Sequence, residues 1–142
     1  MTKKILVVDD DLDFIELLRY RLPDPVYTVL SATNGTDGLN QVWHHLPDVI
    51  LMDLSLPDLD GLTLCEILRR QSSTRQIPIV IVSALANDVT RYSAEIAGAS
   101  GFFAKPLDFD RLKERLSALL AHPRIDPETD RPLVVVGQPS QV

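Results

Sequence analysis

Short apolar runs alternate along this chain with stretches in which apolar residues recur every three or four positions. The runs are rich in Val and Ile and occupy residues 5–8, 26–30, 49–52, 79–82 and 101–104, which is typical of buried parallel strands. Helical spacing follows each run, in the sets Leu12, Ile15, Leu18 and Leu22; Leu39, Val42, Trp43 and Leu46; Leu64, Ile67 and Leu68; Val89, Tyr92 and Ile96; and Phe109, Leu112, Leu116 and Leu119. Five strands alternating with five helices predict an α/β fold with a doubly wound parallel sheet.

Turn-forming and capping residues bound several of the predicted helices. Pro23 and Pro25 end the first helix, Pro47 ends the second, and Asp108 precedes the last as its N-cap. The fourth helix, residues 87–97, has three large apolar residues diluted by Thr, Ser and Ala before a glycine ends it. We therefore expect this helix to have the lowest local stability.

The chain has room for one compact domain, since its 142 residues are 45% apolar. We assign residues 1–121 to that domain. Residues 122–142 contain four of the ten prolines and one apolar cluster at 133–136, which predicts a tail or linker. Three interpretations of the cluster stay open: a disordered segment, an addition to a sheet edge, or the start of a further domain.

Charge and hydropathy exclude two classes of partner. The net charge of −6 argues against a surface that grips nucleic acid, because such a surface needs clustered Lys and Arg. The chain contains no apolar run of about 18 residues and begins without a signal-peptide pattern. We therefore expect a cytoplasmic protein that contacts neither a membrane nor DNA.

Chemically distinct polar residues directly follow four of the predicted strands. Asp9 and Asp10 follow the first, Asp53 the third, Ser83 the fourth and Lys105 the fifth. Ligands of open parallel sheets bind beyond the carboxyl ends of the strands, so these side chains meet at one edge. A carboxylate attacks a phosphoryl group only when the surrounding negative charge is neutralised, which a divalent cation and an ammonium group do together. The pattern predicts phosphoryl transfer.

The acidic residues fit a magnesium site. Mg²⁺ prefers a few carboxylate and carbonyl oxygens together with water and a phosphate oxygen, which Asp9, Asp10 and Asp53 can provide in part. A helix needs one N-cap and not several adjacent acids, whose mutual repulsion at about 4 Å reaches about 4 kcal/mol at an effective dielectric of about 20. A bound cation accounts for the cluster.

Four segments together resemble the receiver domains of two-component response regulators. These CheY-like motifs are the acid pair in residues 5–11, the acceptor segment 47–61, the hydroxyl segment 79–84 and the lysine segment 97–106. The resemblance covers residues 3–121 in order and spacing. It implies a flavodoxin-like sheet with strand order 2-1-3-4-5.

The resemblance also implies a role for each acidic residue. Asp53 is the expected phosphoacceptor. Asp10, Asp53 and the backbone carbonyl of Ser55 are the expected direct Mg²⁺ ligands, and Asp9 is expected to act mostly through a bound water. These assignments follow from the matched positions of the family motif.

Three further positions match the family's activation machinery. The resemblance implies that the Ser83 hydroxyl and the Lys105 ammonium each bind a phosphoryl oxygen. It implies a cis peptide bond between Lys105 and Pro106, and a ring at Phe102 that changes rotamer on activation. The surface of the fourth helix, fifth strand and fifth helix then changes shape.

The resulting functional hypothesis is a signalling switch and not a metabolic enzyme. A sensor histidine kinase or a histidine phosphotransfer protein phosphorylates Asp53, and the altered surface controls a partner, an output domain or a phosphorylation-dependent homodimer. A haloacid-dehalogenase-like phosphatase is the alternative from another class, although the Thr of its Asp-x-Asp-x-Thr motif is missing after Asp9. A third interpretation makes the chain the input half of a DNA-binding transcription factor.

Several conspicuous residues have a structural interpretation. Asp11 is expected to be a helix N-cap, and Cys65 a small core residue. His44 and His45 end a helix, where the helix dipole explains them better than zinc does.

Overall fold

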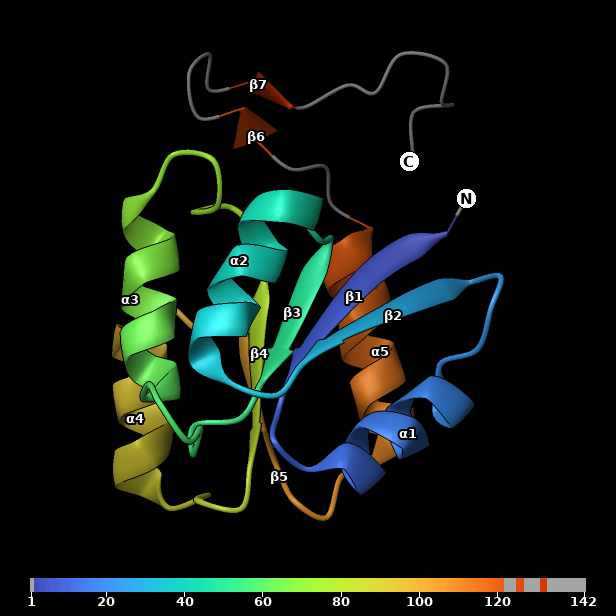
Figure 1. Ribbon diagram of the computed structural model, residues 1–142, viewed down its shortest axis with the longest axis horizontal. Helices are drawn as coiled ribbons and strands as arrows, with labels where there is room; N and C mark the ends of the chain where they lie inside the picture. The colour runs from blue at the N-terminus through green and yellow to red at the C-terminus, as the bar shows by residue number, and fades with distance from the viewer. Residues whose placement is uncertain (1, 122–124, 127–130, 133–142) are drawn as a thin grey trace.

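The computed structural model describes residues 2–121, 125–126 and 131–132. Its principal feature is a parallel sheet with helices on both faces (Figure 1). The elements are β1 (Lys3–Val8), α1 (Leu12–Arg21), β2 (Tyr27–Ala32), α2 (Gly35–His45), β3 (Val49–Met52), α3 (Gly61–Arg70), β4 (Ile79–Ser83), α4 (Asp88–Ile96), β5 (Gly101–Ala104), α5 (Phe109–Leu120), β6 (Ile125–Asp126) and β7 (Arg131–Pro132).

The five long strands lie in the order β2-β1-β3-β4-β5 and are all parallel. This confirms the expected doubly wound, CheY-like sheet. The predicted bounds of the second strand, 26–30, are wrong by up to two residues, because pairing with β1 determines where β2 begins and ends. Lys3 pairs with Tyr27, and Val7 and Val8 pair with Ser31 and Ala32, so β2 continues past the apolar run to residue 32.

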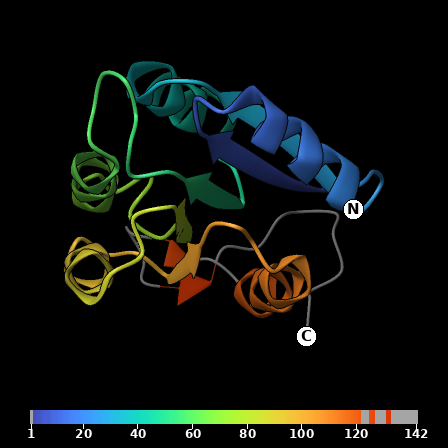
Figure 2. The ribbon, with the colours of Figure 1, turned by 90° about the horizontal axis from the view of Figure 1, so that it is seen from below.

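The sheet separates two hydrophobic cores. Successive side chains of each central strand point alternately into one core and the other. In β3, Ile50 and Met52 pack under α2, α3 and α4, whereas Val49 and Leu51 pack under α1 and α5. Side chains of a strand point alternately to opposite faces, so a strand covered on both faces is apolar throughout. Figure 2 shows α3 and α4 side by side, with α5 on the other side of the sheet.

Carboxylate and amide side chains cap the five main helices, each accepting a hydrogen bond from a first-turn N–H. The caps are Asp11, Asn34, Asp60, Asn87 and Asp108. Such a cap typically contributes about 1 kcal/mol of stability. The predicted caps Asp11 and Asp108 are confirmed.

Helix α4 is oriented differently from what its apolar pattern predicts. Val89, Tyr92 and Ile96 are 75%, 65% and 68% exposed, and the helix buries Ala94 against the sheet instead. Three apolar residues from the predicted sets of other helices, Leu12, Trp43 and Leu46, are also exposed. A small side chain on the inner face lets the helix approach the sheet closely and leaves the larger residues outside.

The described part of the C-terminal region consists of the short antiparallel pair of β6 and β7. The apolar cluster at residues 133–136 lies outside the described residues. Among the described helices, none has the length and hydropathy needed to cross a bilayer.

Candidate functional site

The carboxyl ends of the central strands bring the predicted polar residues to one edge of the sheet. Backbone hydrogen bonds continue the ladder just beyond the strands: Asp9 N–H donates to the Ala32 carbonyl, and Asp53 N–H donates to the Val8 carbonyl. On the other side, Lys105 N–H donates to the Ser83 carbonyl at 3.0 Å. The backbone at Asp9, Asp53 and Lys105 is therefore held by hydrogen bonds to the neighbouring strands.

Asp9, Asp10 and Asp53 form a three-carboxylate cluster. One oxygen from each lies within 4.8 Å of the others, and among the described residues this is the one group of three or more His, Cys, Asp or Glu side chains with such spacing. Asp9 and Asp53 are buried, whereas Asp10 is exposed. The donor set is all oxygen and opens to solvent on one side, so it fits a hard divalent cation that keeps several waters.

Lys105 bridges the two buried carboxylates. Its Nζ lies 2.7 Å from Oδ2 of Asp9 and 3.2 Å from Oδ2 of Asp53. Burial alone would lower the pKa of Lys105, but the hydrogen bond and charge of Asp9, together with those of Asp53, raise it above its ordinary value. The ammonium group therefore stays charged and offsets part of the repulsion within the cluster.

Burial is also the main influence on Asp9. It raises the pKa of the Asp9 carboxyl above its ordinary value, and hydrogen bonds from Lys105 and from the Asp11 N–H oppose that change. Asp9 is 1% exposed and Asp53 is 8% exposed, so Asp9 is the least exposed acid of the cluster.

The acceptor segment after β3 is held in a defined turn. Ser55 N–H donates to Oδ1 of Asp53 at 3.2 Å, and Ser55 pairs with Asp60 in an isolated bridge. Gly61 begins α3 so close to this turn that a Cβ there would lie 2.5 Å from the Asp53 carbonyl oxygen. The short approach fixes the position of Asp53 relative to α3.

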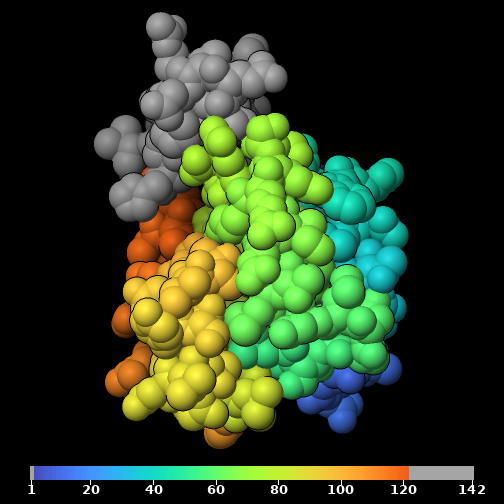
Figure 3. All heavy atoms as spheres, turned by 90° about the vertical axis from the view of Figure 1, so that its left-hand side faces the viewer, coloured from blue at the N-terminus to red at the C-terminus, as the bar shows by residue number. Residues whose placement is uncertain are grey.

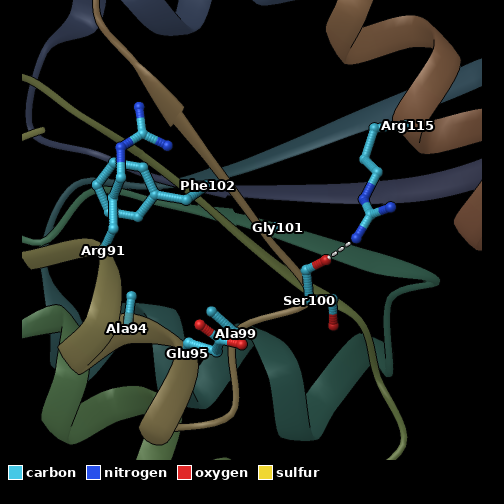
Figure 4. Close-up of a pocket in the computed structure, with 8 residues that line it drawn as sticks. All are labelled: Arg91, Ala94, Glu95, Ala99, Ser100, Gly101, Phe102 and Arg115. Carbon is cyan, nitrogen blue, oxygen red and sulfur yellow. Dashed lines mark hydrogen bonds between the residues drawn. The ribbon is translucent and has the colours of Figure 1, made fainter. Parts of the chain in front are cut away.

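Ser83 lies at the same edge of the sheet, at the end of β4. Phe102 lies next to this edge, within β5. The Ser83 side chain is buried, and its Oγ accepts a hydrogen bond from Leu85 N–H at 3.2 Å. Phe102 lies in β5, half-buried and paired with Ile81 of β4. The Arg91 guanidinium covers the Phe102 ring at 4.7 Å from the ring centroid, as Figure 4 shows.

A groove of about 410 Å³ separates α4 from α5 beside Phe102. In Figure 4, Arg91 of α4 stands at one side of it and Arg115 of α5 at the other, where Arg115 donates a hydrogen bond to the Ser100 carbonyl. Gly101 contributes no side chain to the groove, which keeps the backbone of β5 accessible.

Two contacts at the site were not predicted from the sequence. The centroid of the Phe14 ring lies 4.4 Å from Lys105 Nζ, and Asp58 of the acceptor segment binds the first N–H groups of α2 in addition to its N-cap Asn34. Asp58 accepts hydrogen bonds from the side chain and N–H of Thr36 and from Gly35 N–H, which lower its pKa to about 2. Residue 58 lies within the predicted acceptor segment 47–61, but no local sequence pattern links it to Thr36, 22 residues away in α2.

The residues given a structural interpretation lie as expected. Cys65 is buried, and desolvation raises the pKa of its thiol to about 11. His44 and His45 end α2. The Lys105–Pro106 peptide bond is cis.

The acids, the hydroxyl and the lysine lie at the carboxyl edge of a parallel sheet, which is where open α/β domains bind their ligands. The sequence matches the family model of the response regulator receiver domain over residues 5–117, and the chain therefore belongs to that family. It is 38% identical over 119 residues to the response regulator PleD of Caulobacter vibrioides, a match that covers 84% of this chain and 26% of PleD. The chain thus spans about a quarter of the length of this curated relative.

Solved structures agree with this assignment. The BeF₃-activated N-terminal receiver domain of Klebsiella pneumoniae RstA is 31% identical, with a TM-score of 0.78 over 84% of this chain and 99% of that one. The receiver domain of the Pseudomonas aeruginosa sensor histidine kinase PA1611 is 27% identical, with a TM-score of 0.78 over 86% of this chain and all of that one. That structure contains a magnesium ion coordinated in its active-site cleft.

Proposed function

We propose that this receiver domain accepts a phosphoryl group on Asp53 from the phosphohistidine of a sensor histidine kinase or histidine phosphotransfer protein. The observation that carries the proposal is the bridge from Lys105 Nζ to Oδ2 of both Asp53 and Asp9. In the transfer, an Asp53 oxygen attacks phosphorus, the P–N bond breaks, and the histidine nitrogen leaves with its electron pair. The Lys105 ammonium is close enough to stabilise charge on the transferred group.

Asp9, Asp10, Asp53 and the Ser55 carbonyl would hold Mg²⁺ in this proposal. The oxygen donors of the cluster support the assignment, as does the magnesium ion in the PA1611 receiver domain. When bound, the ion supplies positive charge for the phosphoryl oxygens. The protein's own contribution is to hold three carboxylates together at the end of the sheet, with Lys105 as an internal counter-charge.

Phosphorylation with a small donor tests the acceptor assignment. Incubation with acetyl phosphate and Mg²⁺ is expected to add one phosphoryl group, detected by intact mass and absent in Asp53→Asn. The matched variant Asp9→Asn removes a neighbouring charge and keeps the acceptor. Label that persists in Asp53→Asn and disappears in Asp9→Asn contradicts the proposal and favours phosphatase-like chemistry.

We further propose that Ser83, Phe102 and α4 convert phosphorylation into a change of surface. A phosphoryl group on Asp53 draws the Ser83 hydroxyl toward it, which releases Leu85 N–H and leaves room for the Phe102 ring to turn inward. In turning, the ring leaves the Arg91 guanidinium that now covers it. The loop before α4 therefore moves together with the hydroxyl.

The two ends of α4 are held unequally, which supports this proposal. Next to its C-terminal end, Gly98 has φ of 101°, and its carbonyl accepts a hydrogen bond from the half-buried Arg69 at 2.9 Å. The same guanidinium donates to the carbonyls of Arg75 and Ile77, so it ties α3, the following loop and the end of α4 together. Movement that begins at Ser83 is therefore expected to swing the N-terminal end of α4 about a fixed C-terminal end.

The exposed apolar residues of α4 and of the loop before it are the surface that this movement would present. Leu85, Val89, Tyr92 and Ile96 follow one another at spacings of three or four, and Figure 3 shows α4 in yellow on the outer face beside α3 in green. We propose that this stripe and the neighbouring groove receive a protein partner, an output domain or a second copy of the chain. Sedimentation with and without beryllium fluoride tests the homodimer.

Hydrogen exchange tests the switch. Beryllium fluoride is expected to change the protection of residues 86–103 in the parent chain and to change it much less in Ser83→Ala. Equal changes in both proteins, or changes confined to α2 and α3, contradict the proposed route. Phosphorylation of Ser83→Ala by acetyl phosphate serves as the control that the acceptor is intact.

A further inference from the structure

The Lys105 ammonium has an aromatic contact in addition to its two carboxylates. Its Nζ lies 4.4 Å from the centroid of the Phe14 ring, well within the range of about 6 Å over which the negative face of a ring attracts a cation. The Lys105 side chain is 19% exposed, so water screens the contact only in part. Such contacts are stronger when desolvated.

The ring of Phe14 is fixed by its place in α1. It lies one turn after the N-cap Asp11, whose side chain accepts a hydrogen bond from the Phe14 N–H at 3.2 Å. The ring is half-buried and packs against the core that α1 shares with α5. Helix α1 therefore places the Phe14 ring next to Lys105, although the two residues are far apart in the sequence.

The three contacts of Lys105 differ in what happens to them during phosphoryl transfer. Asp9 and Asp53 are candidate metal ligands, and Asp53 is the candidate acceptor, so both carboxylates must release the ammonium in whole or in part. Phe14 is neutral and has no lone pair for a metal ion. It attracts the ammonium without neutralising the charge that a phosphoryl oxygen requires.

We propose that Phe14 is a positioning residue for Lys105, holding the ammonium at the acceptor while its carboxylate partners change. The proposal rests on the proposed phosphoryl transfer to Asp53. It assigns no chemistry to Phe14 itself, which acts through the lysine. A ring, and not merely an apolar side chain of similar size, is required at this position.

Two variants of Phe14 distinguish the effect of the aromatic ring from the effect of apolar volume. Phe14→Leu keeps an apolar side chain, and Phe14→Tyr keeps the ring. Phe109→Leu is the matched control, because Arg21 covers the Phe109 ring at 4.5 Å and that pair lies outside the acidic cluster. Thermal melting of each variant shows that it is folded before the other measurements are compared.

The first readout is the NMR signal of the Lys105 ε-methylene group in the metal-free protein. A ring beneath the ammonium shifts these protons upfield. We expect the shift in the parent and in Phe14→Tyr, and its loss in Phe14→Leu. An unchanged Lys105 signal in Phe14→Leu overturns the proposal.

The second readout is the rate of phosphorylation by acetyl phosphate. Phe14→Leu is expected to slow it about fivefold, with Phe14→Tyr and Phe109→Leu close to the parent. In a Lys105→Met background, Phe14→Leu is expected to have no further effect. An equal loss in both backgrounds, or the same loss in Phe14→Tyr as in Phe14→Leu, overturns the proposal.

The two readouts fail differently. A parent chain that accepts no phosphate but shows the ring-dependent Lys105 shift refutes the phosphoacceptor function and leaves Phe14 as the residue that positions the lysine. A parent chain that is phosphorylated at a rate indifferent to Phe14→Leu refutes the role of Phe14 alone.

Discussion

Replacement of Lys105 by methionine removes the positive charge that bridges the buried carboxylates of Asp9 and Asp53. At an effective dielectric of about 20, contacts of 2.7 Å and 3.2 Å correspond to about 6 and about 5 kcal/mol of attraction. Three carboxylates within 4.8 Å of one another repel by about 3 kcal/mol or more for each pair, about 10 kcal/mol together. The attraction of Lys105 for Asp9 and Asp53 is therefore about equal to the repulsion among the three carboxylates.

Only part of this energy is expected to appear as lost stability, because the carboxylates can turn toward water when the ammonium is removed. Breaking a buried ion pair on one side typically costs about 3 kcal/mol or slightly more. For a domain of this size, that lowers the melting temperature by about 12 °C in the absence of divalent ions. With the competing ammonium gone, Mg²⁺ is expected to bind Lys105→Met more tightly and to raise its melting temperature more than that of the parent.

Thermal melting in EDTA and over a Mg²⁺ titration measures both effects. The control is Lys113→Met, which removes the same charge from an exposed position of α5. A Lys105→Met protein that melts within about 2 °C of the parent in EDTA contradicts the electrostatic argument. A Mg²⁺ response smaller than that of the parent contradicts it as well.

Three further predictions concern neighbouring residues. Gly61→Ala is expected to destabilise the fold and to slow phosphorylation of Asp53, since a Cβ would overlap the Asp53 carbonyl; chemical denaturation and the acetyl phosphate assay measure the two effects. The pKa of about 2 means that ionised Asp58 stabilises the fold fully above about pH 4 and loses this contribution as the pH falls toward 2; the stability difference between parent and Asp58→Ala is expected to shrink over that range. The buried Cys65 thiol, with its pKa of about 11, is expected to react with a thiol reagent only at the rate of unfolding, and rapid reaction of the native protein would contradict this.

Two strands, β3 inside the sheet and β5 at its edge, were predictable because local apolar runs mark both of their ends. The runs 49–52 and 101–104 match β3 and β5 in both bounds. The bounds of β2 were less accurate because pairing with β1, and not local composition, determines them. In α4, periodicity located the helix, but two faces competed for the sheet, and the one with small Ala residues is inside.

The site was predictable to the extent that strand ends determine it. Acids and lysine at the ends of parallel strands had to meet, and the structure brings Lys105 to Asp9 and Asp53. The sequence did not distinguish Asp9 from Asp10 as the partner of the lysine. The contacts of Phe14 and Asp58 depend on the three-dimensional approach of helices to loops, which no spacing within one segment encodes.

The direction of α5 separates the acidic cluster from the end of the domain. The helix begins shortly after Lys105 and runs antiparallel to the strands, away from their carboxyl ends (Figure 1). Its 12 residues span about 18 Å. A fluorophore or affinity tag attached at residue 121 would thus stand clear of the acceptor. Immobilised or labelled forms of the domain can be made at that end with the phosphoryl donor's approach left open.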